Sequence, residues 1–433
     1  MCVIGYGQYD FCKRYPTILP SYFSIMLAKV IRDTILKLIR NFDDRFYDGN
    51  QPTRMLFIYT HSYGFSCLVP IIQVLEKSKV VYLRTTTHKP VSLKDLEFAN
   101  PKEHEMFHRF HIDSKKAIFA KWHLIVDPHP NNFYPKRRAL RIGMHHGTGF
   151  GAMGSKIGFV QNYDIFLGLS RAERFFLEQL KKGVFENNRA FFAIGNPKAD
   201  RLIENPNLTK QIRARLGVAN RPTILITSHW ETVSTLRSLG HYPFEILAES
   251  LSDCNVIQTG HPWLWEGRTQ SKESKGQLFE KLQQVGERFT NAYFLPHENA
   301  EQLLHIGDLL ITDHSSIFTS FSLLDRPIIW FENPKLSFAI AEIKSIYREA
   351  SVSFTEPQEL PDICRKFLAD PSYKAKGRKR MRETFHANPG AAGEAAADIL
   401  CRIGSVCSQH SRGWDKILTL SQTPEHLPKN PAE

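Results

Sequence analysis

Two histidines that directly follow predicted β-strands could perform acid–base chemistry. His146 is followed by Gly147 and Thr148, in a turn that comes after the apolar stretch 140–144. A glycine lets the backbone turn sharply and approach a ligand closely, and a histidine at a strand end can serve as a general base near neutral pH. We therefore interpret this turn as functional; the structural alternative is a flexible turn whose histidines are buried in the core.

His261 stands between Gly260 and Pro262, after the apolar stretch 255–258. Because a proline restricts the residue before it, His261 is expected to be extended at the end of its strand. An imidazole in that position could bind a phosphate oxygen or protonate a leaving group. A Gly-His-Pro turn is weak evidence in isolation, and it becomes stronger if His261 faces His146 across a cleft.

A third motif combines an acid with two hydroxyls. Asp313 follows the apolar stretch 309–312, and Ser315 and Ser316 begin a predicted helix. Exposed backbone N–H groups at a helix start, together with two hydroxyls, can bind a diphosphate. Ordinary N-capping by Ser315 would give the same sequence, so both interpretations stand at this point.

Two further strand ends carry polar clusters. Ser228 lies in the cluster 227–231, which could reach the same cleft, although the tryptophan of this cluster could equally be packing. Residues 195–200, with the sequence Gly-Asn-Pro-Lys-Ala-Asp, form a turn where two units of the chain meet. We interpret this second cluster as a structural turn and hinge.

Short apolar strands alternate with helical stretches along most of the chain, which predicts parallel, doubly wound sheets. The first set of predicted strands comprises residues 55–60, 80–85, 122–126, 140–144, 163–169 and 190–194. The second set comprises residues 223–227, 255–258, 292–295, 309–312 and 328–331. Since open α/β sheets bind ligands at the carboxyl ends of their strands, the motifs lie where chemistry is expected.

Composition and charge restrict the class of protein. The 433 residues include 56 Lys and Arg against 44 Asp and Glu, a formal net charge of +12, which favours a polyanionic partner such as phosphorylated substrates or an anionic membrane. Zinc-finger and RNP-type motifs do not occur, so we expect no nucleic acid. The seven cysteines form no Cys-x-x-Cys pair, which predicts a reduced, cytoplasmic compartment. No motif has metal-ligand spacing, so we expect no metal and no cofactor.

The motifs, in this order, resemble those of the CDP-glycerol glycerophosphotransferase family, which contains the teichoic acid primases and polymerases. The resemblance covers residues 140–332. The segments that carry it are 146–148 (His-Gly-Thr), 156–159 (Lys-Ile-Gly-Phe), 195–200, 260–262 (Gly-His-Pro), and 312–316 with 324–328.

This resemblance implies an α/β protein of GT-B fold, in which two Rossmann-like domains face a central cleft, here with an N-terminal helical extension. It also implies catalysis without a metal. His146 would deprotonate the acceptor hydroxyl, and His261 would bind the donor diphosphate and assist the departure of CMP. The residues that would bind the donor are Gly147, Thr148, Ser228, Pro262, Asp313, Ser315 and Ser316.

The expected organisation follows from the resemblance and from the patterns at the two ends. Apolar residues between 23 and 38 recur at spacings of three and four, which suits a helix on an anionic bilayer or a surface helix packed on its own domain. The expected parts are a helical, membrane-associating extension (1–50), an acceptor domain (51–205), a nucleotide-donor domain (206–385), a returning C-terminal helix (386–407) and a disordered tail (408–433).

The leading hypothesis is a transferase that moves glycerol phosphate, or a related polyol phosphate, from a CDP-activated donor to a cell-surface polymer or lipid-linked acceptor. Such an enzyme would serve wall or capsule biogenesis from the inner face of the cell membrane. The alternatives are a nucleotide-sugar glycosyltransferase or UDP-sugar 2-epimerase of the same fold, and a non-catalytic, membrane-associated binding protein. The departures from the family pattern are the insert 149–155, Ser320 in place of an aspartate, and residues 227–230 in place of a Pro-Thr-Trp turn.

Overall fold

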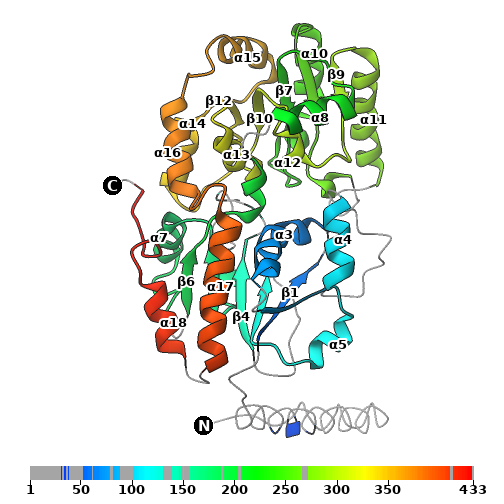
Figure 1. The fold of residues 1–433 in the computed structure, drawn as a ribbon. Helices are drawn as coiled ribbons and strands as arrows, with labels where there is room; N and C mark the ends of the chain where they lie inside the picture. Colours follow the sequence, from blue (N-terminus) through cyan, green and yellow to red (C-terminus); the bar gives the residue numbers. More distant parts are fainter. Residues whose placement is uncertain are drawn as a thin grey trace, which may run out of the picture.

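The computed structural model shows two lobes, each built on one parallel β-sheet covered by helices (Figure 1). It describes residues 31, 34, 35, 38, 52–60, 62–78, 81–87, 101–129, 139–145, 147, 150, 156–186, 189–202, 206–265, 272–409 and 413–431. The two parallel sheets confirm the predicted α/β architecture of GT-B type.

The first sheet has the strand order β2-β1-β3-β4-β5-β6, and every neighbouring pair is parallel. Its strands are β1 (Thr53–Tyr59), β2 (Val81–Thr87), β3 (Leu124–Asp127), β4 (Leu140–Met144), β5 (Ile165–Gly168) and β6 (Ala190–Ala193). Its helices are α3 (Ser62–Lys77), α4 (Pro101–Phe110), α5 (Ser114–Phe119), α6 (Lys156–Val160), α7 (Arg171–Leu180) and the 3₁₀ turn η3 (Pro197–Leu202).

The second sheet has the order β12-β11-β10-β7-β8-β9, again with parallel pairs throughout. Its strands are β7 (Thr223–Ile226), β8 (Asn255–Gln258), β9 (Ala292–Phe294), β10 (Leu309–Thr312), β11 (Ile328–Phe331) and β12 (Val352–Phe354). All but β12 coincide with a predicted strand. β12 was missed because three residues, of which one is serine, are too short to show a hydrophobic period.

The helices of the second lobe connect its strands and cover both faces of the sheet. They are α8 (Pro206–Leu216), α9 (Thr235–Leu239), α10 (Tyr242–Ser250), η4 (Pro262–Leu264), α11 (Lys272–Arg288), α12 (Ala300–Leu303), α13 (Ser316–Phe321), η5 (Ser322–Leu324), α14 (Ala341–Ala350), η6 (Pro357–Glu359), α15 (Leu360–Ala369) and α16 (Ala375–Phe385). The polar stretch between the two sets of predicted strands contains the helix α8.

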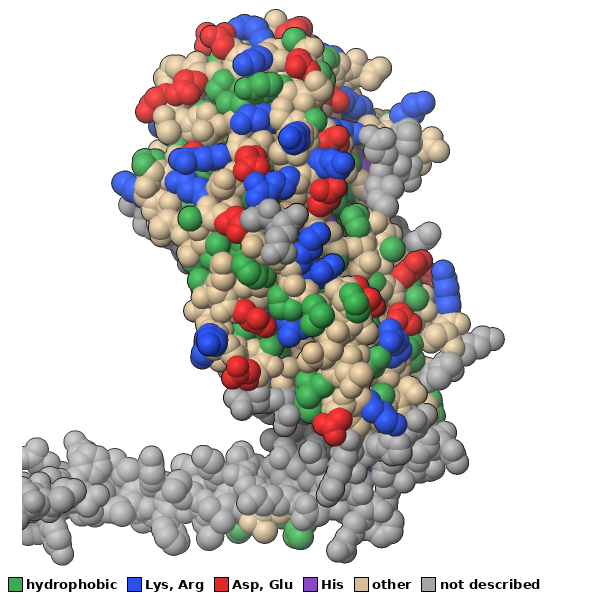
Figure 2. Space-filling model, turned by 90° about the vertical axis from the view of Figure 1, so that its left-hand side faces the viewer, with side chains coloured by type: hydrophobic (Ala, Val, Ile, Leu, Met, Phe, Trp, Pro, Cys, Tyr) green, Lys and Arg blue, Asp and Glu red, His purple; other side chains and the backbone are tan. Residues whose placement is uncertain are grey.

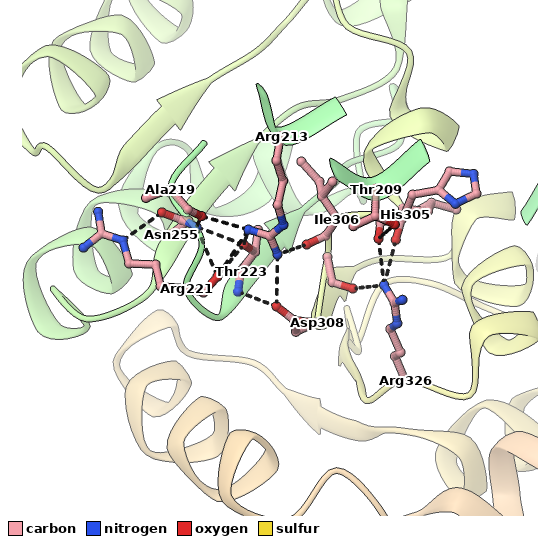
Figure 3. A network of polar contacts seen from close by, with 12 residues as sticks. Thr209, Arg213, Ala219, Arg221, Thr223, Asn255, His305, Ile306, Asp308 and Arg326 are labelled. Atoms are coloured by element: carbon pink, nitrogen blue, oxygen red, sulfur yellow. Dashed lines mark hydrogen bonds and ion pairs between the residues drawn. The ribbon is translucent and has the colours of Figure 1, made fainter. Parts of the chain in front are cut away.

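A hydrogen-bond network fixes the amino ends of the central strands of the second sheet (Figure 3). Arg213 of α8 donates to Thr223 Oγ1 (3.0 Å) and to the Ile306 carbonyl (3.1 Å). The Asp308 carboxylate, just before β10, accepts from the Thr223 backbone N–H at 2.8 Å. The Asn255 amide donates to Thr223 Oγ1 at 3.0 Å. Because one end of β7, β8 and β10 is fixed in this way, the loops at the opposite, carboxyl end start from defined positions.

The chain returns from the second lobe to the first through α17 (Ala392–Gln409), which packs on α3 and β1 (Figure 1). The Asp200 carboxylate accepts from the backbone N–H groups of Ala392 (3.0 Å) and Gly393 (2.7 Å) at the start of this helix. A negative charge there interacts favourably with the helix dipole. Asp200, in the cluster interpreted as a hinge, therefore anchors the returning helix.

Two more residues of that cluster join the lobes. Gly195 has a φ of +96°, and a Cβ at this position would lie 2.0 Å from the carbonyl oxygen of Ala387. Only glycine fits this close approach between two chain segments. The Lys198 ammonium, which is buried, lies 2.7 Å from the Glu301 carboxylate at α12 of the second lobe. A buried pair of this kind fixes geometry more than it adds stability.

The C-terminal part of the chain is ordered, which corrects the expectation of a disordered tail. Helix α18 (Trp414–Ser421) places Ile417 in the core of the first lobe, and this helix contacts β6. Beyond it, His426 Nδ1 accepts from the Ala193 backbone N–H at 3.1 Å. The apolar spacing of Trp414, Ile417 and Leu418 predicts such a helix, and the prolines that follow it obscured this pattern.

The expected N-terminal extension lies outside the described residues except at four positions. Ile31, Thr34, Ile35 and Leu38 are helical and exposed. Ile31, Ile35 and Leu38 have exposed fractions of 51%, 50% and 64%, which is high for large apolar side chains. Among the residues that the structure describes, no helix is both long enough and apolar enough to cross a bilayer.

Basic and acidic side chains are interspersed on the face that carries α14 and α16 (Figure 2). The pairs on this face include Arg382 with Asp325 at 2.9 Å and Lys344 with Glu332 at 3.0 Å. Ion pairs at the protein surface contribute about 0–1 kcal/mol each. Part of the positive excess is therefore compensated locally on this face.

His386 gives the fold a pH dependence that can be measured. It is buried at the end of α16, and its Nε2–H donates to the Thr319 carbonyl at 2.9 Å. Burial lowers its pKa to about 4 against the opposing effect of this hydrogen bond, so the unfolded chain binds the proton first as the pH falls. Between pH 6.5 and 4 this group should lower the unfolding free energy of the wild type by up to about 3 kcal/mol. The variant His386→Gln should lack this decrease.

Urea unfolding at a series of pH values measures this effect as the difference between the two stability profiles. His104→Gln on the exposed face of α4 is the control and should leave the profile unchanged. Parallel profiles for the wild type and His386→Gln would contradict the assignment.

Candidate active site

The second sheet places three histidines at one level of its carboxyl edge. In its parallel register, Ile226 of β7 is paired with Ile311 of β10 on one side and with Gln258 of β8 on the other. His229, His314 and His261 each lie three residues beyond these paired residues. Equal offsets from paired positions bring the three imidazoles together on adjacent loops.

The reversal of strand order makes this edge the expected position of a ligand. From β7 the chain first adds β8 and β9 on one side, and then β10, β11 and β12 on the other. This is the strand order of the classical dinucleotide-binding fold, in which ligands bind at the carboxyl ends of the two strands where the order reverses. Those strands are β7 and β10, which carry His229 and His314.

The carboxylate of Asp313 ties the two loops to each other. Its Oδ2 accepts from the backbone N–H groups of His229 (2.9 Å) and Thr235 (3.0 Å) and from Ser228 Oγ (3.2 Å). Its Oδ1 accepts from the Ser315 N–H at 3.1 Å. Asp313 is 1% exposed. Both of its oxygens are thus engaged with the protein, so Asp313 organises the loops from beneath.

The imidazoles form a chain of contacts above Asp313. The ring centroid of His229 lies 4.8 Å from that of His314 and 5.8 Å from that of His261. Nε2 of His314 lies 2.8 Å from the Glu231 carboxylate. Burial opposes protonation of His314, but the hydrogen bond to Glu231 and the negative charges of Asp313 and Glu231 together outweigh this effect and raise its pKa. The same hydrogen bond lowers the pKa of Glu231, so the two form an ion pair.

His229 differs from its neighbour in charge. Burial lowers its pKa against the opposing attraction of Asp313, and the nearby His314 lowers it further. The pKa values of the two imidazoles thus shift in opposite directions, which disfavours a positive charge on both rings at this short distance. Nδ1 of His229 is a hydrogen-bond acceptor, because the Glu231 backbone N–H donates to it at 3.4 Å.

His261 is held in the extended conformation expected before Pro262, with φ −61° and ψ 136°. Its backbone N–H donates to the Ser228 carbonyl at 2.9 Å, which ties its loop to the loop after β7. Its Nδ1 accepts from the Trp263 N–H at 3.2 Å. The proton of a neutral His261 therefore belongs to Nε2, which can donate to a ligand.

The two serines differ in how their hydroxyls are used. Ser228 Oγ donates to Asp313 and accepts from the Leu236 N–H at 3.0 Å. Ser315 is the N-cap residue of α13, but its side chain makes no capping hydrogen bond, and its Oγ lies 3.4 Å from Thr312 Oγ1. The capping alternative raised for Ser315 is thus not adopted here. Ser316 is half-buried at the first position of the helix.

A surface hollow of about 430 Å³ adjoins this cluster. Its lining residues are Trp230, Glu231, Thr232, Val233 and Arg237. Trp230 also packs on Trp263, with ring centroids 5.0 Å apart. The hollow therefore combines an aromatic wall with a cationic side chain, and Glu231 belongs both to it and to the histidine cluster.

His146 and Thr148 lie outside the described residues, and Gly147 is half-buried. His145 is buried, with Nε2 at 2.5 Å from the carboxylate of Glu173, whose other oxygen accepts from the Leu169 N–H at 2.6 Å. His145, which directly precedes His146 in the sequence, thus has a structural role in the core.

Sequence reasoning missed the group formed by His229, Glu231 and His314. The ligand atoms of these three side chains lie within 4.8 Å of one another. The expectation that no metal-ligand cluster exists rested on local spacing, whereas these residues come from two loops more than 80 positions apart. The sequence did contain one indication, because His229 and His314 each lie two residues beyond the end of a predicted strand.

Comparison with known proteins gives a consistent family. Residues 71–337 match a family profile described as CDP-Glycerol:Poly(glycerophosphate) glycerophosphotransferase. A teichoic acid poly(glycerol phosphate) polymerase of Bacillus spizizenii is 26% identical over 179 residues, which are 39% of this chain and 41% of that protein. The matched part of this chain thus spans about two fifths of the length of that relative.

Solved structures show the same architecture. A variant of the wall teichoic acid polymerase TagF has a TM-score of 0.61 at 15% identity, over 94% of this chain and 100% of the other. The same enzyme soaked with CDPG gives a TM-score of 0.59 over the same shares. HepE of Anabaena, with UDP and glucose bound, gives 0.50 at 12% identity, over 81% of this chain and 100% of the other. At these identities the likeness shows the fold alone.

The hydrogen bonds that Asp313 accepts from the two loops predict that its replacement lowers the stability of the fold. In Asp313→Asn an amide NH₂ would face backbone N–H groups that now donate to a carboxylate, which leaves buried donors without an acceptor. We expect a loss of about 1–3 kcal/mol, measured by urea unfolding. Asp362→Asn, on a side chain 92% exposed, is the control and should change stability by less than about 0.5 kcal/mol. Equal stabilities of the two variants would show that the Asp313 carboxylate does not stabilise these loops.

Proposed function

We infer that this chain, which belongs to the CDP-glycerol:poly(glycerophosphate) glycerophosphotransferase family, transfers glycerol phosphate or a related polyol phosphate from a CDP-activated donor. The acceptor in this proposal is a cell-surface polymer or a lipid-linked precursor. The observation that carries the proposal is the set of three imidazoles at the strand-order reversal of the second sheet, beside an aromatic hollow. Such an arrangement suits an anionic nucleotide donor.

In the proposed reaction the acceptor oxygen attacks the phosphorus that bears the glycerol. A bond forms between these two atoms, the bond from this phosphorus to the bridging oxygen breaks, and its electron pair leaves on CMP. His146 would accept the proton of the acceptor hydroxyl. Because the reaction is one of positioning and charge dispersal, the binding groups matter as much as the base.

The second lobe supplies the donor-binding groups of this proposal. His261 Nε2 would donate to a diphosphate oxygen. Trp230 and Arg237 would contact the nucleotide in the hollow they line. Ser315, Ser316, Gly147 and Thr148 would contact the phosphate or glycerol end, while Ser228, Pro262 and Asp313 would position the loops.

The metal independence implied by the family resemblance is not carried into this proposal. The resemblance predicts no metal, but His229, Glu231 and His314 meet at the same edge of the sheet. Cofactor-free catalysis by the histidines therefore needs a direct test with a chelator.

We place the enzyme at the cytoplasmic face of the membrane in wall or capsule biogenesis, because the acceptor class is membrane-bound and the N-terminal region is basic. The exposed Ile31, Ile35 and Leu38 recur at helical spacing, as in helices that bind the surface of anionic bilayers.

A donor-release assay tests the catalytic assignment. With CDP-glycerol and a polyol-phosphate acceptor, His146→Ala should lower turnover at least about a hundredfold, since a general base contributes ~10²–10⁴-fold. His261→Ala should chiefly raise the KM for CDP-glycerol, because it removes a donor to the diphosphate. His108→Ala on the exposed face of α4 is the control. Release of UDP from UDP-sugars, with no CMP from any CDP-polyol, would reject the proposed function in favour of a nucleotide-sugar enzyme.

A flotation assay with liposomes tests the membrane proposal. We expect the wild type to bind vesicles of an anionic lipid and to bind zwitterionic vesicles weakly. The triple variant Ile31→Ser, Ile35→Ser and Leu38→Ser should lose most of this binding, while CMP release with a soluble acceptor stays unchanged. Equal flotation of the triple variant would contradict a role for this helix.

A further inference from the structure

We infer that His229, Glu231 and His314 bind a divalent cation of the zinc class at the nucleotide end of the site. Two imidazoles and one carboxylate come from the loops after β7 and β10, which Asp313 ties together. The binding site is inferred from these residues alone, and only its role in catalysis rests on the proposed function.

The distances are close to those that a cation requires. Glu231 Oε2 lies 2.8 Å from His314 Nε2 and 3.7 Å from His229 Nδ1. Ligand bonds of about 2.0–2.2 Å in a tetrahedral arrangement place the ligand atoms about 3.3–3.6 Å apart. One observed separation is shorter than this range and the other is slightly longer. Rotation of the Glu231 side chain, which is 39% exposed, can adjust both.

The electrostatics of the group favour a cation between its members. The lone pair of His229 Nδ1 accepts from the Glu231 N–H, and the same nitrogen lies 3.7 Å from the negative Glu231 carboxylate. A divalent ion between the two imidazoles and the carboxylate would replace these contacts by three ligand bonds, and His314 would release any proton on Nε2 to solvent when the ion binds.

The backbone positions of both histidines are fixed before any cation binds. The N–H of His229 donates to Asp313, and His314 lies between Asp313 and Ser315, whose N–H donates to the same carboxylate. His314 is 4% exposed. A site whose ligands are already ordered loses little conformational freedom on binding.

The ligand set selects the class of cation. Two imidazole nitrogens and one carboxylate suit Zn²⁺ and the other late first-row ions, whereas Mg²⁺ and Ca²⁺ prefer oxygen ligands. Three protein ligands leave a position open for an exogenous group. Because Glu231 also lines the hollow beside Trp230, this position is accessible to the donor.

The role of the cation follows from the proposed transfer. The bond between the glycerol-bearing phosphorus and the bridging oxygen breaks, and its electron pair leaves on CMP while the acceptor proton goes to His146. A cation held beside the nucleotide phosphate would neutralise the charge that develops on this leaving group. The chain would then use a metal where the family resemblance implies none.

Calorimetric titration of the full chain with ZnCl₂ tests the site, after treatment with a chelator and exchange into chelator-free buffer. We expect one equivalent to bind, with MgCl₂ binding at least a hundredfold more weakly. Titration with CoCl₂ should produce the visible absorption bands of a nitrogen- and oxygen-ligated ion of low coordination number.

Matched variants identify the ligands. Glu231→Gln and His229→Ala should each weaken Zn²⁺ binding at least tenfold, with unchanged circular dichroism because neither side chain is fully buried. The rival chelating pair is His104 and His108 on α4, whose Nε2 atoms lie 3.1 Å apart on the exposed surface. The double variant His104→Ala/His108→Ala should keep the binding.

The outcomes separate the cation site from the transferase proposal. Zn²⁺ binding that survives Glu231→Gln, or that disappears only with the α4 pair, overturns the site. CMP release by a chelator-treated chain that binds no Zn²⁺ also overturns the site and leaves the transferase. Binding that depends on Glu231, without release of nucleotide from any donor, supports the site and overturns the transferase.

Discussion

The carboxylate of Asp313 is the interaction on which the second lobe's site depends. One buried acid accepts hydrogen bonds from backbone N–H groups of the loop after β7, of the start of α9 and of its own loop after β10. Parallel pairing of β7 with β10 brings these loops side by side, but pairing alone does not fix their side chains. The hydrogen bonds of Asp313 convert two adjacent loops into one rigid support for His229 and His314.

The opposite end of the same strands is fixed by a different means. There Arg213, Asn255 and Asp308 bind backbone and side-chain atoms at the amino ends of the strands. Strands that are anchored at both ends cannot slide along one another, because a shift by one residue would break both sets of bonds. The equal offset of the three histidines is therefore maintained by interactions at both the amino and the carboxyl ends of these strands.

The junction between the lobes combines apolar contact with a few specific bonds. Phe150 of the first lobe stacks on Phe385 of α16 with ring centroids 4.1 Å apart, and the two lobes share a continuous apolar core. Asp200 anchors the helix that returns to the first lobe. The Gly-Asn-Pro-Lys-Ala-Asp cluster thus joins three chain segments, which explains why it contains a glycine, a lysine and an acid.

The sequence by itself determined the α/β class and eleven of the twelve strands of the described sheets. It also placed His261, Asp313 and Ser315 at strand ends. These features were predictable because apolar runs followed by polar turns are local patterns. The sequence could not show that β7 lies between β8 and β10, since these strand neighbours are fixed by packing between residues 32 and 85 positions apart. Only this order brings His229 and Glu231 to His314, and only the tertiary structure shows that Asp313 faces the protein. The packing of α18 was decided in the same way, by an apolar surface of the first lobe that no local pattern records.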